Sequence, residues 1–312
     1  MTEPVAAFAA DVGPPGAGPV VAVGGRTQWD VGGPVRAADG ATVREVRPPV
    51  GIVAVEAADM TVRVRAGTTV ADLDDALAEV GQTVALPAWP GATVGGVLAV
   101  GRSGIRHLGW GPVRDTVLEV RYVSAEGAVV KAGGPTVKNV SGFDLCRLLV
   151  GSLGTLGLIA EVVLRTRPLP AAERWVSGVA DPFPLVSRLS RPASVLWDGT
   201  TTWVLLEGHP EDVASQARAT GLTDAPGPPD LPQHRWSLRP RDLRALAGAD
   251  GPDVFVGLLG VGVAHASAPQ PPRLVDPEVG ALHERIKRLF DPTGRLAPGR
   301  DPLVATTTAG AR

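Results

Sequence analysis

The sequence predicts an α+β protein made of two domains. Its 312 residues are about twice the usual length of one domain, and short segments with alternating apolar side chains are mixed with amphipathic helical segments. A Pro-rich break without periodicity runs from Arg165 to Arg174. We therefore expect a first domain over residues 1–168, itself two α+β subdomains that split near residue 55, and a smaller α+β domain over residues 169–312. The C-terminal helix and tail of the second domain are expected to return to the first.

The composition is that of a soluble globular protein, with 44% hydrophobic and 20% charged residues. A formal net charge of -2 gives no global field for a polyanion, which argues against nucleic acid as the main partner. The single Cys146 excludes intramolecular disulfides and Cys-rich metal sites, and it favours a reducing compartment. Glu3 follows Met1 without a basic stretch, and no apolar run reaches ~18 residues. We therefore expect no signal peptide, no spanning helix and a cytoplasmic location.

The first half of the chain predicts strands joined by turns, with one clear helix. Residues 1–19, rich in Ala, Gly and Pro, indicate a loose lead-in to a short strand at 19–23. Alternation of Val and Arg over 60–66 predicts a second strand. Thr69 is a typical N-cap and Gly81 a typical stop for an amphipathic helix between them.

Further along, residues 116–131 predict a hairpin, Asp144 caps a short helix, and 158–165 form a strand. The second half indicates a small α+β layer. Its predicted elements are strands at 194–197, 201–206 and 253–263, helices at 210–219 and near 242–246, and a helix from Asp276 and Pro277 to Phe290.

Several common chemistries have no motif here. No G-x-G-x-x-G lies between a strand and a helix and no Gly-Lys pair occurs, so neither a Rossmann fingerprint nor a Walker loop is predicted. The five histidines form no H-E-x-x-H pattern, so we expect no metal site. Ser103 lies in Gly-Arg-Ser-Gly, which is not the G-x-S-x-G elbow of a hydrolase.

What remains is a set of three glycine-rich loops next to predicted strands. They are residues 24–28, residues 90–96 continued by 98–104, and residues 138–144 continued by 151–157. Gly-Gly pairs alone carry no weight, because the sequence has four and about five are expected by chance. A single such loop is more often a sharp turn, yet three together favour a nest of main-chain N–H groups for a diphosphate.

Side chains in and near these loops suit the same ligand. Hydroxyl donors would come from Thr27, Thr93, Ser103 and Thr155. Apolar walls for planar rings would come from Leu98, Leu156 and Ile159. Because glycine lets a ligand approach the backbone closely, no cationic side chain is required.

Four motifs, in this order and at similar intervals, resemble the FAD-linked oxidases of the vanillyl-alcohol-oxidase and p-cresol-methylhydroxylase type, among them the FAD-binding subunits of bacterial glycolate oxidases. The motifs are Gly91–Gly96, Gly111–Asp115, Lys138–Asp144 and Gly151–Gly157, and the likeness returns at 288–300. The resemblance implies the two-subdomain FAD-binding fold of the p-cresol-methylhydroxylase type with a short α+β cap domain.

The resemblance also implies noncovalently bound FAD. The implied cofactor-binding residues are Gly24, Gly25, Arg26, Thr27, Gln28, Gly91, Ala92, Thr93, Gly95, Gly96, Ser103, Gly154, Thr155, Gly157, Leu158 and Ile159. Gly24 to Thr27 and Gly91 to Gly96 would lie near the pyrophosphate, and Gly154 to Ile159 near the adenosine half.

In this family a 2-hydroxy acid such as glycolate gives a hydride to the flavin, and electrons pass to an iron–sulfur partner or a quinone. The implied partners are a larger flavoprotein subunit and an iron–sulfur subunit, which would also supply any peripheral membrane contact. Two alternatives stay open. One is a flavin-holding scaffold without turnover, and the other is a stand-alone FAD-dependent alcohol or lactone oxidase.

The sequence departs from the family pattern in places. Phe143 stands where relatives often have Tyr, and Ala297 where they commonly have Asn. The second domain lacks the His-rich strand motif, and only His265 lies in a similar place. A single His after an apolar run is more often a packed strand residue than a base, so no catalytic residue is predicted.

Other candidates favour structural roles. Arg106 and His107, near Trp110, predict a solvated surface loop rather than a carboxylate site. Cys146 predicts a buried, unreactive thiol. Arg114 and Asp115 predict a structural ion pair.

Overall fold

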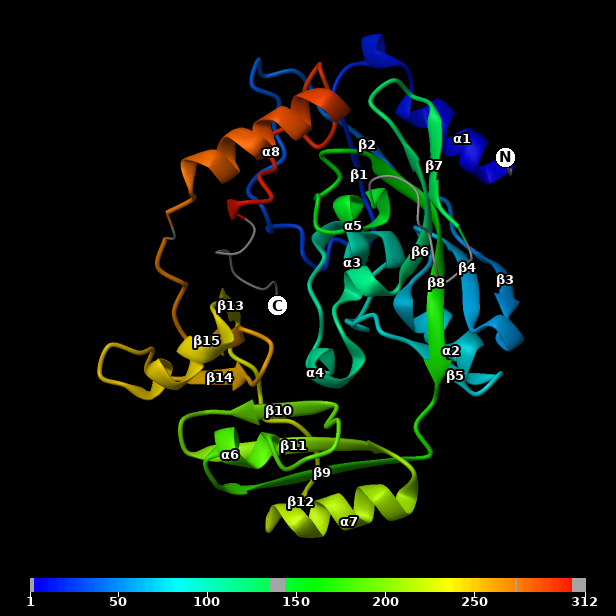
Figure 1. The fold of residues 1–312 in the computed structure, drawn as a ribbon. Helices are drawn as coiled ribbons and strands as arrows, with labels where there is room; N and C mark the ends of the chain where they lie inside the picture. The colour runs from blue at the N-terminus through cyan, green and yellow to red at the C-terminus, as the bar shows by residue number, and fades with distance from the viewer. Residues whose placement is uncertain (1–2, 135–143, 273, 305–312) are drawn as a thin grey trace. The chain divides into compact units, whose positions relative to one another are not determined.

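The computed structural model describes residues 3–134, 144–272 and 274–304, and they divide into two compact units. The first unit contains the chain up to Arg102, residues 112–168 and the segment from Leu274. The second contains residues 103–111 and 169–272. Figure 1 shows helices and strands mixed along the whole chain, so the predicted α+β class is confirmed. The short excursion at 103–111 was not predicted.

The N-terminal segment is a helix rather than a loose lead-in. Helix α1 (Glu3–Val12) buries Val5, Phe8 and Val12, which are spaced to share one face. They pack against the two-stranded parallel sheet of β1 (Val20–Ala22) and β2 (Arg44–Val46). The prediction failed because many alanines and nearby prolines mask a short pattern of three large apolar residues.

The main sheet of the first unit is antiparallel, with the order β3-β4-β8-β6-β7 and β5 paired to β8. Its strands are β3 (Ile52–Glu56), β4 (Thr61–Arg65), β5 (Gln82–Val84), β6 (Val117–Val123), β7 (Val129–Gly133) and β8 (Leu158–Pro168). Along the chain, the two-stranded sheet ends with β2 at Val46 and this sheet begins with β3 at Ile52. The strand at 60–66 and the hairpin at 116–131 are confirmed.

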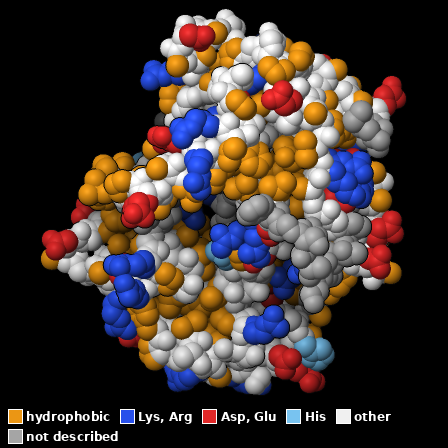
Figure 2. Space-filling view, turned by 45° about the horizontal axis from the view of Figure 1, so that its top comes forward, with side chains coloured by type: hydrophobic (Ala, Val, Ile, Leu, Met, Phe, Trp, Pro, Cys, Tyr) orange, Lys and Arg blue, Asp and Glu red, His pale blue; other side chains and the backbone are white. Residues whose placement is uncertain are grey.

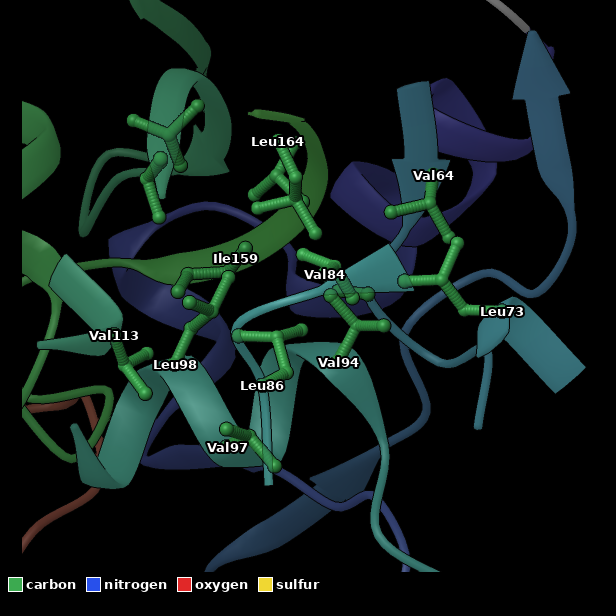
Figure 3. Close-up of a cluster of buried hydrophobic side chains, with 14 of the residues drawn as sticks. Val64, Leu73, Val84, Leu86, Val94, Val97, Leu98, Val113, Ile159 and Leu164 are labelled. Carbon is green, nitrogen blue, oxygen red and sulfur yellow. The ribbon is translucent and has the colours of Figure 1, made fainter. Parts of the chain in front are cut away.

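One face of this sheet carries the main core of the first unit. Helices α2 (Val70–Ala78), α3 (Val94–Val100) and α5 (Leu145–Leu149) pack apolar side chains there, as Figure 3 shows for Leu73, Leu98 and their neighbours. Thr69 caps α2 as predicted, since its Oγ1 accepts a hydrogen bond from the N–H of Asp72 at 3.1 Å. Two short 3₁₀ turns, η2 (Ala57–Asp59) and η3 (Val113–Asp115), link the strands.

The opposite face of the same sheet holds a buried ion cluster. Glu119 and Glu161 are fully buried, and Nη1 of Arg63 lies 2.9 and 3.2 Å from their carboxylates. Lys131 Nζ lies 3.1 Å from Glu119, and Arg121 lies 3.3 Å from Glu161. Burial alone raises the pKa of Glu119, but hydrogen bonds from Arg63 and Lys131 outweigh it and the net pKa is lowered.

The C-terminal segment has two buried charges, of which Asp291 bonds within the segment and Arg295 ties it to the N-terminal part of the chain. Helix α8 (Pro277–Phe290) starts at the Asp276 N-cap as predicted. Asp291 accepts hydrogen bonds from Lys287 Nζ at 2.6 Å and from two backbone N–H groups. Arg295, 3% exposed, donates to the carbonyl oxygens of Val12, Gly13, Gly18 and Ala125. These bonds explain why a distant tail belongs to the first unit.

The second unit is built on a seven-stranded antiparallel sheet of order β12-β9-β11-β10-β14-β15-β13. Its strands are β9 (Ala172–Val179), β10 (Ser194–Trp197), β11 (Thr201–Gly208), β12 (Thr223–Ala225), β13 (His234–Ser237), β14 (Phe255–Leu258) and β15 (Val263–Ala266). Its helices are α4 (His107–Trp110), α6 (Pro182–Val186), α7 (Pro210–Thr220) and the 3₁₀ helix η4 (Pro240–Ala247).

Both faces of this second sheet are apolar. One packs against α6, α7 and η4 through Leu185, Val213 and Leu243. The strand predicted at 253–263 is two strands, β14 and β15, because Gly260 and Gly262 have φ of +71° and +76° and turn the chain between them.

Two further findings bear on function. Within the described ranges no helix combines the length and apolar character needed to cross a membrane, and no group of three or more His, Cys, Asp or Glu could hold a metal ion. On the face shown in Figure 2, acidic and basic side chains are interspersed with hydrophobic ones rather than gathered into a field of one sign.

Candidate cofactor-binding site

The first two predicted loops interlock at their glycines. A Cβ added to Gly24 would lie 2.2 Å from Thr93 Oγ1, and one added to Gly25 would lie 1.7 Å from the carbonyl oxygen of Gly91. No real side chain tolerates such contacts. Glycine is therefore required at both positions to let residues 24–28 pass directly over the turn at 90–93.

The first loop offers a row of unused main-chain donors. Among the described residues, the backbone N–H groups of Gly24 to Gln28 donate no hydrogen bond to another residue, and neither does that of Thr93. Arg26 adopts a φ of +56°, so the chain bends sharply within this row. Successive N–H groups at such a bend are the donor set that suits phosphate oxygens.

Thr93 and the two glycines after it mainly build the turn into α3. Thr93 Oγ1 accepts a hydrogen bond from the N–H of Gly96 at 3.2 Å, as an N-cap does. The N–H of Gly95 donates a hydrogen bond to the carbonyl oxygen of Ala66 at 2.8 Å. A Cβ added to Gly95 would lie 2.7 Å from the Cβ of Ala66. Gly95 therefore serves the packing of α3 on β4, which sequence reasoning did not anticipate.

A second observation points to a ligand at this loop. Gln28 Oε1 is buried and has no hydrogen-bond partner in the described structure. Such an acceptor is costly unless a donor reaches it. Polar hydrogens of a bound dinucleotide would supply one.

The charge of Arg26 is already occupied. Its Nη2 lies 2.5 Å from Glu45, and its guanidinium lies 4.8 Å from the ring centroid of Trp29. Arg300 stacks over the same ring at 4.8 Å and donates to the carbonyls of residues 31 and 33. Sequence reasoning missed this arrangement because Arg300 lies far along the chain. The loop's affinity for an anion must therefore come from its amides.

A cavity of about 690 Å³ lies beside the same segment. It is lined by Val21, Trp29, Asp30, Gly33, Pro34, Val35, Arg36, Ala37, Gly40, Ala41, Val43 and Glu45. None of these residues belongs to the predicted cofactor-binding set.

The third predicted loop is bound to the second by main-chain hydrogen bonds. The N–H of Gly151 donates to Leu98 at 2.9 Å and that of Leu153 to Ala99 at 2.8 Å. A Cβ on Gly101 would lie 2.8 Å from Cα of Gly151, so these segments also meet at glycines. Apart from residues 103 and 104, the described parts of the three glycine-rich regions thus lie in one unit, with the second in contact with the other two.

Several side chains of the third loop pack in the core of the first unit, and their contact with a ligand stays a prediction. Thr155 is 4% exposed, and its hydroxyl donates to the carbonyl of Ser152 at 2.7 Å. A Cβ on Gly157 would lie 2.3 Å from the ring of Tyr122. Leu158 and Ile159 are 1% and 6% exposed and lie in hydrophobic clusters.

The same holds for the predicted apolar walls. Leu98, Leu156 and Ile159 all belong to the main core of the first unit, where Figure 3 shows Leu98 and Ile159. Gly151 and Gly154, with φ of +86° and +77°, are the residues of this loop whose conformation favours glycine for backbone reasons.

Other predicted residues lie elsewhere. Ser103 belongs to the second unit, whereas the rest of the cofactor-binding set belongs to the first. Residues 138–143 of the third loop, Phe143 included, lie outside the described residues. Ala297 is buried beside β1, where its N–H donates to the carbonyl of Val20.

Three structural predictions are resolved. Cys146 is buried and its pKa is raised to about 11, chiefly by burial, so an unreactive thiol is confirmed. Asp115 pairs with Arg147 at 2.7 Å instead of Arg114, because α5 brings Arg147 over the η3 turn. Arg106 is half-buried rather than fully solvated, and it binds Glu207 and Glu173 at 2.6 Å each.

Comparison with known proteins fits this geometry. Residues 17–133 match the family described as FAD binding domain. The chain is 31% identical over 228 residues to glycolate oxidase subunit GlcE of Escherichia coli (strain K12), covering 67% of this chain and 61% of that protein. It is 42% identical over 122 residues to D-lactate dehydrogenase of Archaeoglobus fulgidus, covering 38% of this chain and 26% of that protein.

A solved structure extends the likeness to the fold. Alkyldihydroxyacetonephosphate synthase superposes with a TM-score of 0.65 at 14% identity, covering 90% of this chain and 72% of the other. The predicted fold type is thereby confirmed. The chain spans 61% of the length of the glycolate oxidase subunit and 26% of that of the D-lactate dehydrogenase.

Proposed function

We propose that this chain, which carries an FAD-binding domain of the p-cresol-methylhydroxylase type, is the flavin-holding subunit of a dehydrogenase for small 2-hydroxy acids. Two relatives named above are a glycolate oxidase subunit and a D-lactate dehydrogenase, and glycolate and lactate are both 2-hydroxy acids. The observation that carries the proposal is the interlocked pair of glycine turns with its row of unused amides, inside the matched FAD-binding domain.

The residues present fit the diphosphate of FAD. The N–H groups of Gly24 to Gln28 would hold its oxygens, and the turn at Gly91 to Thr93 supports that loop from the other side. Gln28 Oε1 would accept a hydrogen bond from the cofactor. Bound FAD would supply the ring that accepts a hydride, and the chain's own contribution is to hold and orient it.

The partners belong to the same proposal. A relative named as a subunit of glycolate oxidase supports a complex, in which this chain works beside a larger flavoprotein subunit and an iron–sulfur subunit. Electrons would leave through the iron–sulfur partner or a quinone. The cytoplasmic location stays a prediction that rests on the single reduced cysteine.

The absorption spectrum of the purified chain tests the cofactor directly. We expect flavin bands, and release of FAD on acid denaturation because the binding is noncovalent. A colourless protein that takes up no added FAD would contradict the proposal.

Substitution of Gly25 tests the site itself. Gly25→Ala forces a Cβ into the carbonyl of Gly91, so we expect loss of most bound FAD. Gly16→Ala is the control in the same unit, because no atom lies within 4 Å of a Cβ placed there. Circular dichroism confirms that both variants fold. Equal FAD content in the two variants would show that residues 24–28 do not form part of the FAD-binding site.

Anaerobic addition of glycolate or D-lactate separates the alternatives. The subunit function predicts flavin bleaching only when partner subunits are present. Bound flavin that no 2-hydroxy acid reduces, with or without partners, would indicate a scaffold. Bleaching of the isolated chain would indicate a stand-alone oxidase.

A further inference from the structure

Arg235 is a partly buried arginine without a carboxylate. It lies on β13, the edge strand of the second unit's sheet. Its Nη1 donates to Ser237 Oγ at 3.2 Å, while Nε is buried and has no hydrogen-bond partner. Among the described residues no Asp or Glu forms an ion pair with it, and burial is the single cause that lowers its pKa, to about 10. The guanidinium is therefore still charged at neutral pH.

This arrangement is unfavourable for the protein alone. A buried charge without a counter-ion loses its hydration and gains nothing in return. The part of the guanidinium left without partners is the edge formed by Nε and Nη2, since no described hydrogen bond involves either nitrogen. That edge presents two parallel N–H groups, the geometry that matches the two oxygens of a carboxylate.

The neighbours of Arg235 are fixed by the sheet. His265 on β15 lies directly opposite Arg235 in the register, and Val256 on β14 lies opposite His265, so the three side chains share one face. His265 Nδ1 lies 3.1 Å from the carbonyl oxygen of Pro232, which can only accept. His265 Nδ1 therefore carries a hydrogen and donates it.

The edge strand is also held in place. The amide of Gln270 makes two hydrogen bonds with the backbone of Ser237, accepting from its N–H at 2.9 Å and donating to its carbonyl at 2.7 Å. Apolar Val256 and Val263, 4% and 6% exposed, lie on the same face as Arg235. A rigid cation beside apolar side chains suits a small organic acid better than a hydrated inorganic anion.

We propose that Arg235, with Ser237 and His265 beside it, forms a binding site for the carboxylate of a small hydroxy acid in the second unit. The site rests on the geometry around Arg235, and the choice of a hydroxy acid rests on the function proposed above. Arg235 as a residue keeps intermediate exposure, so solvent reaches the site although Nε is enclosed.

Binding of oxalate to the full chain, measured by calorimetry at constant ionic strength, tests the site without catalysis. Oxalate has no hydrogen on carbon, so it cannot give up a hydride. We expect Arg235→Met, which keeps the apolar stem, to weaken oxalate binding by about tenfold or more. Arg174→Met is the matched control, because Arg174 is exposed on the same sheet and pairs with Asp224. It should leave the affinity unchanged.

Arg235→Lys distinguishes a binding role from a purely structural one. Lys restores a point charge without the two-pronged edge, so we expect an intermediate affinity and an unchanged melting temperature. Wild-type affinity in Arg235→Met would overturn the proposal. So would failure of the wild type to bind oxalate in excess of chloride, or equal affinity for sulfate, which would indicate a general anion site.

Flavin reduction separates this inference from the proposed function. A chain that binds oxalate through Arg235, but whose flavin no 2-hydroxy acid reduces even with partners, contradicts the function and leaves the site. A flavin that is reduced with the same KM in wild type and Arg235→Met contradicts the site and leaves the function.

Discussion

Two arginines of the second unit, Arg106 and Arg235, have opposite surroundings. Arg106 binds Glu207 and Glu173 at 2.6 Å each, and its guanidinium lies 5.3 Å from the ring centroid of Trp110. Trp110 in turn donates to Glu207 at 2.6 Å. Arg235 has one hydroxyl partner and no carboxylate among the described residues.

The difference separates a structural charge from one kept for a ligand. Burial alone lowers the pKa of Arg106, but the two glutamates outweigh it and the net pKa is raised. The charge of Arg106 thereby fastens residues 103–111 to the sheet. The charge of Arg235 forms no ion pair among the described residues, and its burial opposes folding. Stability measurements on single variants can break or sharpen this contrast.

The largest loss is expected in the first unit, from Arg295→Met. This change removes a donor from four carbonyl oxygens, of which, among the described residues, only that of Val12 keeps another, from Arg44. We therefore expect about 3–5 kcal/mol lower stability in urea unfolding. Arg285→Met on the exposed side of α8 is the control. Equal losses in the two variants would show that a partnered buried arginine need not be structural.

Arg106→Met should have the next largest effect, about 2 kcal/mol, because it strips Glu207, 8% exposed, of its cation. The value is reduced because the Arg106 side chain is 34% exposed. Combining it with Glu207→Gln should cost less than the sum of the two single changes. Strict additivity would mean that the pair does not interact.

Arg235→Met should change stability by less than about 1 kcal/mol, and a gain is consistent with removal of an unpaired charge. Thermal unfolding of the ligand-free chain measures it. A loss as large as that of Arg106→Met would erase the contrast between the two residues.

Acid titration sharpens the comparison with the ion cluster of the first unit. The pKa of Glu119 is lowered in the folded chain, so its contribution is present above the unfolded pKa of about 4.3 and lost as pH falls through the folded value. Stability of the wild type should therefore fall more steeply below about pH 5 than that of Glu119→Gln. Parallel pH profiles would contradict the assigned pairing.

The smallest effect concerns Cys146, a buried titratable group that is neutral at physiological pH. With a pKa of about 11, its thiol should react with a disulfide reagent at pH 8 far more slowly in the native chain than in urea. Equal rates would show that the thiol is exposed.

Local signals made much of the fold predictable. The caps at Thr69 and Asp276 and the alternation over 60–66 are each contained within a few residues of sequence. The pairing of Arg235 with His265 is not, because it depends on the register of strands about 30 residues apart. The contact between Arg106 and Glu207 could not be predicted either, because the two residues are far apart in the sequence.

The candidate cofactor site was predicted in part. Its glycine turns could be predicted because positions without room for a side chain, such as Gly25, require glycine, and glycine can be read from the sequence. The hydroxyl of Thr155 and the side chain of Ile159 were assigned to the ligand from residue type alone. Whether such a side chain faces a ligand or the core depends on packing that no short motif records.

The excursion at residues 103–111 has a practical consequence for dissecting this protein. The backbone leaves the first unit after Arg102, returns at Pro112, leaves again after Pro168 and comes back at Leu274. Neither half can therefore be produced as one uninterrupted fragment. A truncation at Pro168 would remove Asp291 and Arg295 from the first unit and would leave Arg106 without Glu173 and Glu207. Each unit therefore needs residues from both sides of this cut.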